Sequence, residues 1–325
     1  MDIKGGFMKN IKRILSIILA SSLIFSLSAC GSFNNVAIAT GGTSGTYYGF
    51  TGVVAQVLNN KLNGKINFTV ESTGASKANV QLVDSGDCKI ALLQNDVMYY
   101  AYTATDMFEG SNPVTSFSSI AGVYPETIQI VAQKGITSVD QLRGKVVSVG
   151  DAGSGVEFNA RQVLEAYGMD IDKDIKKNNQ SFADSADSLK NGTIDAAFVV
   201  AGHPTVAITE LASNYDFEIL NIDDMHLATL QSKYSFYSKA TIPNGTYSKI
   251  NGARQTAAVV ATFIAGNNVS EDTVYEFTKG LFEYKNEFQH AKAEQIDINY
   301  AYETAKSINI HPGALKYYKE KGLVN

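Results

Sequence analysis

The sequence predicts an α/β protein of two lobes that follows an export signal. From about residue 36 onward, short apolar runs alternate with amphipathic segments, the pattern of strands followed by helices. The chain has 325 residues, of which 45% are hydrophobic and 18% are charged. This is an ordinary soluble composition, large enough for a substantial core and most naturally for two lobes. Since no flexible linker separates the lobes, we expect strands to cross between them.

The first 29 residues are expected to be a signal peptide. Four basic residues precede an uncharged run of sixteen residues, 14–29, whereas a membrane-spanning helix needs about 20. The ending LSAC, followed by Gly31, resembles a bacterial lipobox, so Cys30 is the expected lipidated first residue of the mature chain. An uncleaved membrane anchor is the alternative. Under both interpretations the remainder works outside the cytoplasm, attached to the membrane.

Charge and cysteine content narrow the possible partners. Cleavage after residue 29 removes four basic and one acidic side chain, which leaves 23 basic and 31 acidic ones and a net charge of −8. No basic patch is present, so nucleic acid is not an expected partner. With lipid on Cys30, the remaining thiol is Cys88, and no intramolecular disulfide can form. Cys88 lies in a strand-like run, which favours a buried, inert thiol over a reactive one.

The predicted elements fall into two α/β units and a C-terminal segment. In the first unit we expect strands over 36–40, 66–71 and 89–94, and helices over 47–60 and 75–85. The second unit begins near residue 124, with expected strands over 127–133, 145–150 and 194–202. Its expected helices are a short one capped by Ser138, one over 156–168 closed by Gly168, and one that begins near Pro204.

The C-terminal segment is expected to add core rather than a ligand site. A strand is predicted over 257–266, and Ser270 should cap a helix with acidic residues in its first turn. Val274, Phe277, Leu281 and Phe288 recur at helical spacing, which indicates a packed face. Pro312 opens the last predicted helix. The lobes predicted from this pattern are residues 30–123 with 249–325, and residues 124–248.

Three glycine-rich or small-residue loops each follow a strand and open a helix. They are TGGTSGTYY (40–48), ESTGAS (71–76) and GDAGSG (150–155). In an open α/β sheet such loops lie at the carboxyl ends of the strands, where ligands bind. Each offers backbone N–H groups and the positive end of a helix dipole. If the two units face each other, the loops converge on a cleft suited to a small anion such as a carboxylate.

Nucleotide binding and catalysis are not expected at these loops. No lysine follows the first loop as a Walker-type loop requires, and the dinucleotide-binding glycine spacing is absent. No nucleophile elbow surrounds Ser44 or Ser154, and the four histidines are scattered without metal-ligand spacing. Asp96 and Asp151 could form a carboxylate pair, but we favour bonds to backbone amides in their own loops. We therefore expect no enzyme activity, no cofactor and no metal.

A few side chains near the loops are candidate ligand contacts. Tyr47 and Tyr48 open the first helix, and because neighbouring helical residues point about 100° apart, we expect one to face the ligand and the other the core. Tyr48 is slightly favoured for the ligand. Tyr124 lies between the two units. It is expected either to have a hinge or ligand-binding role or to be a core tyrosine. His203 follows a strand end and is expected either in the cleft or bonded within its loop.

Several motifs together resemble a known family. In order along the chain they are ATGGTSGTYY, ESTGAS with Asn79, LLQNDV, GVYPE, SVDQLRGKVVSVGDAGSG, GTIDAAFVVAGHPT, IPNGTY and HPGALKYYKEKGL. These segments resemble those of the TAXI proteins, the extracytoplasmic solute receptors of one class of TRAP transporters. The similarity extends over nearly the whole mature chain.

The resemblance implies a type II periplasmic-binding-protein fold, in which hinge strands join two α/β lobes around a cleft. It implies capture of a glutamate-like or dicarboxylate solute and its delivery to the TRAP permease membrane subunits, which an ion gradient drives. The implied ligand contacts in the first lobe are Gly42, Thr43, Tyr47, Tyr48, Thr73, Gly74, Ala75 and Ser76. In the second lobe they are Tyr124, Gly153, Ser154, Gly155 and Val156, and His203 is expected to tune the choice of ligand.

We therefore expect a monomeric, lipid-anchored binding protein for amino acids or other small carboxylates. The alternative is a ligand-sensing lipoprotein of the same fold that does not take part in transport. Adjacent genes for TRAP membrane subunits would favour the first, and a lone gene or a neighbouring histidine kinase gene would favour the second.

Overall fold

The structure is a computed structural model that describes residues 34–324. The predicted signal peptide and the lipidation at Cys30 lie outside the described residues. The strands are β1 (Asn34–Ala39), β2 (Ile66–Glu71), β3 (Ile90–Gln94), β4 (Phe117–Gln133), β5 (Val146–Ser148), β6 (Lys176–Asn178), β7 (Ala196–Ala201), β8 (Phe217–Leu220), β9 (Ser238–Ile242) and β10 (Arg254–Gly266).

The helices occupy the segments between these strands and the C-terminal part of the chain. The α-helices are α2 (Thr46–Leu62), α3 (Ser76–Ser85), α4 (Asn95–Thr103), α5 (Gly155–Ala166), α6 (Phe182–Lys190), α7 (Val206–Asn214), α8 (Asp224–Lys233), α9 (Glu271–Glu283), α10 (Ile298–Ala305) and α11 (Pro312–Glu320). Short 3₁₀ helices are η1 (Asp106–Phe108), η2 (Val139–Leu142), η3 (Lys285–Glu287) and η4 (Ala291–Gln295). Among the described residues, no helix is both long and apolar enough to cross a bilayer.

The strands form one hydrogen-bonded sheet whose order is β2-β1-β3-β10-β4-β7-β5-β6, with β8 paired to β4 and β9 paired to β10. β1 runs parallel to β3, and β5 runs parallel to both β6 and β7. The two long strands β4 and β10 are antiparallel to each other and to their outer neighbours β7 and β3. The mixed α/β class predicted from the alternating pattern is confirmed.

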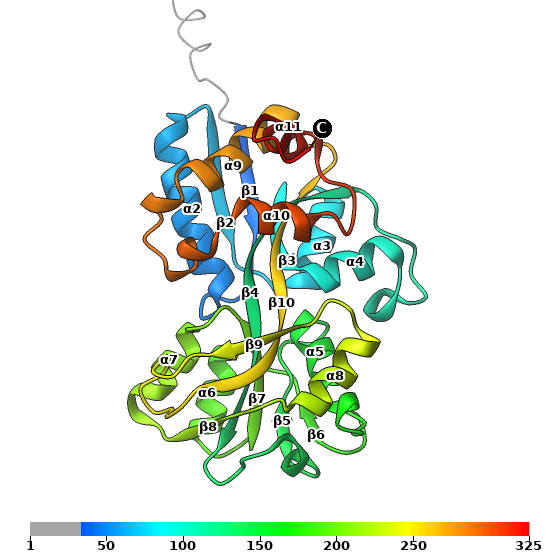
Figure 1. Cartoon of the computed structure of the whole chain (residues 1–325), viewed down its shortest axis with the longest axis vertical. Helices are drawn as coiled ribbons and strands as arrows, with labels where there is room; N and C mark the ends of the chain where they lie inside the picture. Colours follow the sequence, from blue (N-terminus) through cyan, green and yellow to red (C-terminus); the bar gives the residue numbers. More distant parts are fainter. Residues whose placement is uncertain (1–33, 325) are drawn as a thin grey trace, which may run out of the picture. The chain divides into compact units, whose positions relative to one another are not determined.

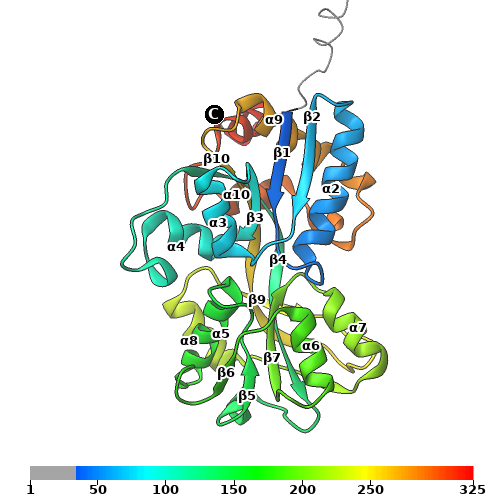
Figure 2. The same cartoon turned by 180° about the vertical axis from the view of Figure 1, so that it is seen from behind.

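β4 and β10 join two lobes (Figures 1 and 2). Lobe 1 contains β1–β3, α2–α4 and α9–α11, and lobe 2 contains β5–β9 and α5–α8. The predicted crossing strands are thus present, but β4 begins at Phe117, ten residues before the predicted strand. Residue 124 lies inside β4, where no break marks a lobe boundary, so the division at residues 124 and 249 stays a prediction.

Each lobe has apolar layers on both faces of its strands. In lobe 1, residues of α2 and α9 form one core, and residues of α3 and α4 form another on the opposite face. Because both faces are covered, all five residues of β3 are buried and the strand has no polar face. Lobe 2 repeats this arrangement with α5 and α8 on one side and α6 and α7 on the other.

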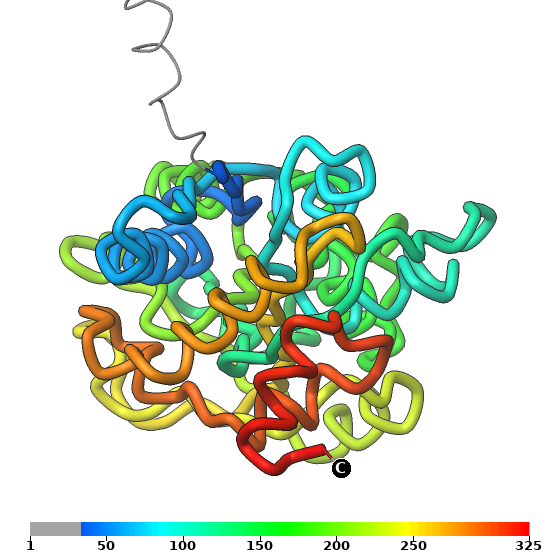
Figure 3. The backbone as a smooth tube through the Cα atoms, turned by 90° about the horizontal axis from the view of Figure 1, so that it is seen from above, coloured from blue at the N-terminus to red at the C-terminus, as the bar shows by residue number. Residues whose placement is uncertain are grey.

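The C-terminal helix packs within lobe 1. α11, red in Figure 3, lies against α9, and Gly313 permits this approach because a Cβ there would come within 2.3 Å of the Glu271 carbonyl oxygen. Val274, Phe277 and Leu281 are buried on α9, as their spacing predicts. Phe288 is also buried but lies beyond the helix, which ends at Glu283.

Candidate functional site

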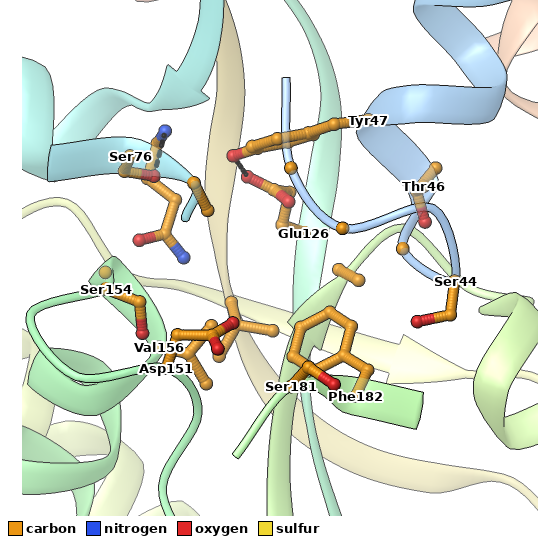
Figure 4. A pocket seen from close by; sticks show the side chains of 18 residues that line it. Ser44, Thr46, Tyr47, Ser76, Glu126, Asp151, Ser154, Val156, Ser181 and Phe182 are labelled. Carbon is orange, nitrogen blue, oxygen red and sulfur yellow. Dashed lines mark hydrogen bonds between the residues drawn. The ribbon is translucent and has the colours of Figure 1, made fainter. Parts of the chain in front are cut away.

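The N-termini of five helices border one cavity between the lobes (Figure 4). Their N-cap residues are Gly45 of α2, Ala75 of α3 and Gln94 of α4 in lobe 1, and Ser154 of α5 and Ser181 of α6 in lobe 2. Helix N-termini present backbone N–H groups and partial positive charge. The sequence predicted three of these five termini, those of α2, α3 and α5.

The cavity is small and enclosed by both lobes. Its volume is about 50 Å³. The lining residues are Gly41, Gly42, Ser44, Gly45, Thr46, Tyr47, Ala75, Ser76, Gln94, Glu126, Asp151, Ser154, Gly155, Val156, Ser181, Phe182, Val200 and Ala201. With the lobes in contact, this space admits only a small molecule.

The two lobes present helix termini of different chemistry to the cavity. The N-cap residues of α2, α3 and α4 form no side-chain bond to their helices, although in α4 the Asp96 carboxylate accepts from the Val97 amide. In lobe 2, the Ser154 hydroxyl accepts a hydrogen bond from the Glu157 amide, and the Ser181 hydroxyl accepts one from the Asp184 amide. A side-chain cap occupies an N–H that a ligand would otherwise bind. The N-termini in lobe 1 are therefore better suited to hold an anionic ligand.

Glu126 of β4 is a buried acidic group on the cavity wall. Glu126 is only 1% exposed, and its Oε2 accepts a hydrogen bond of 2.5 Å from the Tyr47 hydroxyl (Figure 4). Burial raises the pKa of Glu126 to about 8, although the Tyr47 hydrogen bond favours the ionised form. Without a cationic partner, this carboxyl is therefore mostly protonated at neutral pH.

A second carboxylate, Asp151, also lines the cavity, where burial raises its pKa. Within the described part of the chain, the lining residues include no lysine, arginine or histidine. The buried Lys292 influences Glu126 electrostatically but does not line the cavity. Its Nζ lies 3.4 Å from Gln295 Oε1 and 5.8 Å from the centre of the Tyr124 ring. Burial lowers the pKa of Lys292 to about 8.

The lobes touch each other beside α2. The Thr46 hydroxyl donates a 2.7 Å hydrogen bond to the Gly202 carbonyl, and the Ala207 amide donates one of 3.2 Å to the Ser44 carbonyl. Gly202 must lack a side chain here, because a Cβ would lie 2.6 Å from Lys292 Cε. These bonds close one side of the cavity.

On the other side, buried polar groups join α4 to α5. Asn159 Oδ1 accepts a 2.8 Å bond from Gln94, and its Nδ2 donates to Asp96 at 2.9 Å and to the Tyr237 hydroxyl at 2.7 Å. Burial raises the pKa of Asp96 to about 6. Gly155 allows this contact, because a Cβ there would lie 1.7 Å from Gln94 Oε1. Both sides of the cavity are thus closed by contacts between the lobes.

Comparison with known proteins establishes the family. The sequence profile of the NMT1-like family matches residues 38–322, nearly all of the described chain. The chain belongs to the NMT1-like family.

Solved structures of low sequence identity share the fold of this NMT1-like chain. PhnD1 from Prochlorococcus marinus (MIT 9301), solved in complex with methylphosphonate, has a TM-score of 0.53 at 11% identity, covering 90% of this chain and 99% of that chain. A protein from Bordetella bronchiseptica RB50 has a TM-score of 0.52 at 14% identity, covering 88% of each chain. The predicted fold, a two-lobed type II periplasmic-binding-protein fold, is confirmed.

Half of the predicted contact residues line the cavity. They are Gly42, Tyr47, Ala75, Ser76, Ser154, Gly155 and Val156. Tyr47, not the Tyr48 that the sequence favours, lines the cavity. Tyr47 is 7% exposed and points its hydroxyl at Glu126, whereas Tyr48, one helical step further, is half-buried outside the lining. That preference needs correction, since the order of the two rings around α2 depends on how the helix packs.

The other predicted contacts in the first two loops lie outside the lining. Thr43 is exposed. The Thr73 hydroxyl donates to the Thr40 carbonyl and to Asn79 Oδ1 and accepts from the Ala75 amide, so it holds the second loop in place. Gly74 precedes Ala75 without entering the lining. Of these three residues, Thr73 has a structural role in the loop, and none of the three lines the cavity.

In the remaining loops, Tyr124, Gly153 and His203 also lie outside the lining. Tyr124 is fully buried against Phe50, with ring centroids 5.2 Å apart, in agreement with the core alternative. The Gly153 amide donates to Glu157 Oε2. His203 Nδ1 lies 3.1 Å from the hydroxyl of Thr127 on β4, so its partner is outside its own loop, and the His203 side chain lines a separate groove with residues of β4 and β9.

Sequence reasoning missed several lining residues, above all Gln94, Glu126, Ser181 and Phe182. The helices α4 and α6 were not predicted, so the caps Gln94 and Ser181 were not considered. Glu126 had one recognisable signal, because it is an acidic residue within a strand that is otherwise almost entirely buried. Asp96 accepts a bond from the Val97 amide in its own helix, as the favoured interpretation predicted, whereas Asp151 reaches the cavity.

Proposed function

We propose that this chain is the extracytoplasmic solute-binding receptor of a TAXI-type TRAP transporter and that it captures a small carboxylate between its lobes. The observation that carries the proposal is the convergence of five helix N-termini on one small cavity, two of which, those of α2 and α3, have neither a side-chain cap nor an acidic residue in the first turn. The family and the fold support a solute-binding protein. The sequence motifs described above favour the TAXI class.

The proposed binding mechanism follows from the geometry of the two lobes. The carboxylate of the ligand takes N–H donors at the starts of α2 and α3, together with the Ser76 hydroxyl. Lobe 2 then covers it with the starts of α5 and α6. The ligand favours closure only to the extent that its contacts are better in the closed form than in the open one. Gly42 and the other loop residues keep the backbone close to the ligand.

A carboxylate fits the charges of this cavity better than a dianionic head group does. Glu126 and Asp151 both line the cavity, and no cationic side chain of the described residues offsets them there. A phosphonate carries up to two charges on one group, and no cationic side chain among the described lining residues balances the second charge, whereas a carboxylate carries only one. We therefore place the selectivity of this chain with carboxylates.

Ligand binding is tested by a thermal-shift screen of the mature protein, residues 30–325, with amino acids, dicarboxylates, phosphonates, sulfonates and sugars. A ligand that binds only the native state stabilises it and so raises the melting temperature. At a ligand concentration of 100 times the Kd, the free energy of unfolding increases by about 2.7 kcal/mol. We expect small carboxylates alone to do so. Stabilisation by a sugar or a phosphonate but by no carboxylate would refute the proposed ligand class.

The role in transport needs a separate test. We expect the purified protein to drive uptake of its ligand into proteoliposomes that contain TRAP membrane subunits, under an imposed sodium or proton gradient. Uptake that is unchanged without the protein would favour the sensing alternative. Mass spectrometry of the protein from membranes tests the predicted lipid on Cys30, and light scattering tests the predicted monomer.

A further inference from the structure

We infer that Glu126 selects the ligand by charge, because its second carboxylate oxygen accepts the cationic amine of an amino acid and so excludes the same acid without its amino group. This inference rests on the proposed function, since it concerns the same cavity. It assigns to Glu126 a role in specificity that neither the fold nor the family supplies.

The hydrogen bonds of Glu126 leave one oxygen for a ligand. Oε2 accepts from the Tyr47 hydroxyl at 2.5 Å, and within residues 34–324 no hydrogen bond to Oε1 is formed. The side chain is nonetheless almost completely buried and lies on the cavity wall (Figure 4). A buried carboxylate without a full set of donors is costly unless a partner arrives. A ligand amine is such a partner.

The charge distribution points to a cation at this position. The lining contains two carboxyl groups, Glu126 and Asp151, and no basic side chain among the described residues. The positive N-terminal ends of α2 and α3 can bind a carboxylate, whereas Glu126 and Asp151 can bind a cation. A zwitterion matches both parts of the cavity, but a dicarboxylate would bring a second negative charge to a described lining that has no cationic side chain to balance it.

Glu126 lies in the fold where a ligand held between the lobes can reach it. It lies on β4, one of the two strands that pass through both lobes, and pairs with Val259 of β10. Tyr47 comes from α2, at the start of the helix that we propose binds the carboxylate. The Tyr47–Glu126 bond therefore holds the amine acceptor at a fixed position relative to the carboxylate donors.

Capture of an amine at Glu126 releases a proton at neutral pH. Burial raises the pKa of Glu126 to about 8, and Asp96 opposes its ionisation, whereas Lys292 and the Tyr47 hydroxyl favour it. Tyr124 and Tyr300 are the other titratable groups nearby, and burial raises the pKa of both. The amine brings its own positive charge, so the carboxyl proton passes to solvent when the ion pair forms. Affinity for an amino acid should then rise with pH up to about 8.

The decisive experiment compares acids that differ only in the α-amino group. Calorimetric titrations use L-glutamate and glutarate, L-glutamine and glutaramate, and L-leucine and 4-methylpentanoate, with wild type, Glu126→Gln and the control Glu218→Gln, which changes a half-buried glutamate of β8 outside the cavity. The amide oxygen introduced by Glu126→Gln would still accept the Tyr47 hydrogen bond. We expect wild type and Glu218→Gln to prefer the amino acid in at least one pair. Glu126→Gln should lose roughly 10- to 150-fold affinity for that amino acid and none for its deaminated partner.

Proton release provides an independent readout. Titration of wild type at pH 7 in buffers of different ionisation enthalpy should show nearly one proton released per amino acid bound, and Glu126→Gln should show none. Between pH 6 and 8 the wild-type affinity should rise by up to about tenfold per pH unit. Lys292 titrates near the upper end of this range, but it is unchanged in Glu126→Gln, so the difference between the two proteins isolates Glu126.

The outcomes separate the inference from the proposed function. If the deaminated acids bind wild type as tightly as the amino acids, or if proton uptake replaces release, Glu126 does not accept an amine, and the carboxylate receptor itself stands. If none of the six acids binds and no other small carboxylate raises the melting temperature, both fail. A melting curve of Glu126→Gln that matches wild type at pH 6 shows that the variant is folded.

Discussion

The two walls of the cavity use helix N-termini in different ways. In lobe 1, α2 and α3 begin without a side-chain cap and without an acidic residue in the first turn. In lobe 2, α5 and α6 are capped by serine hydroxyls and carry Glu157 and Asp184 in their first turns. The positive ends of the lobe 2 helices are therefore largely satisfied within the chain, and those of lobe 1 are left for a ligand.

This difference indicates a division of labour. Lobe 1 supplies most of the binding energy for an anionic group, and lobe 2 mainly excludes water and completes the enclosure. One detail supports it: Ala75, the N-cap of α3, has φ 64° and ψ −148°, a conformation that side chains rarely adopt. Strain of this kind is found where a loop is held for function.

The largest effect is expected where the walls meet, at Gly155. In Gly155→Ala the new Cβ would lie 1.7 Å from Gln94 Oε1 and 3.0 Å from Val97 Cγ2, so Gln94 must leave Asn159 and move into the cavity. We expect ligand affinity to fall by about 1–3 kcal/mol, the usual cost of overpacking. Calorimetry measures the affinity, and small-angle scattering with ligand measures whether the lobes still close.

The matched control for that variant is Gly52→Ala. Gly52 lies inside α2 and has nothing within 4 Å of an added Cβ. It should leave affinity unchanged and raise stability slightly, since alanine suits a helix interior better than glycine does. Equal affinity in Gly155→Ala and wild type would show that the contact between α4 and α5 is not needed for binding.

A second effect is expected when a side-chain cap is introduced at the uncapped N-terminus of α2 in lobe 1. In Gly45→Asp a carboxylate would occupy the N-cap of α2, where the backbone φ of −90° accepts any residue. The added charge competes with the ligand carboxylate, so affinity should fall by about tenfold or more. Gly45→Asn supplies a neutral cap of the same shape and should cost less. Should both variants bind like wild type, α2 would not be an anion-binding terminus.

Between the walls, Glu126 should give a pH-dependent stability. Its pKa is raised by burial from an ordinary 4.5 to about 8, so the folded protein keeps a proton that the unfolded chain gives up between these values. Stability of the ligand-free protein should therefore fall as pH rises from 5 toward 8, by roughly 2 kcal/mol between pH 5 and about 7, whereas Glu126→Gln lacks this component.

Urea unfolding at several pH values measures this difference. Asp96 and His203 also titrate in or near this range, but they are present in both proteins and cancel in the comparison. Parallel stability curves for wild type and Glu126→Gln would mean that Glu126 is not a buried acid of raised pKa.

The smallest effect on ligand affinity is expected in lobe 2, where a serine already caps α6. Ser181→Ala removes a hydroxyl that accepts from the Asp184 amide at 3.2 Å and donates to the Asp184 carboxylate at 2.6 Å. It should cost about 1 kcal/mol of stability, as loss of a cap does, with little change in affinity. A large loss of affinity with unchanged stability would reverse the assignment, because Ser181 would then serve the ligand rather than α6.

The sequence predicted the elements whose signals are local. The strands of lobe 1 and the helices α2, α3, α5 and α9 were found within a few residues, because hydrophobic periodicity, capping residues and glycine loops mark them directly. β4 was predicted ten residues too short, since its first half is buried on both faces and lacks an alternating pattern. The helices α4 and α6 were missed because their polar residues bind partners far away in the sequence. For example, Asp96 of α4 accepts a hydrogen bond from Asn159.

The sequence by itself determined the α/β class, the two lobes and the loops that start α2, α3 and α5. Each of these depends on residues close together along the chain. Only the tertiary structure decided that Tyr47 rather than Tyr48 faces the cavity, that Gly155 must lack a side chain, and that Glu126 and Asp151 line the same cavity. These features depend on the approach of segments up to 79 residues apart, as in the Tyr47–Glu126 bond. A local pattern cannot encode which distant surface a side chain will meet.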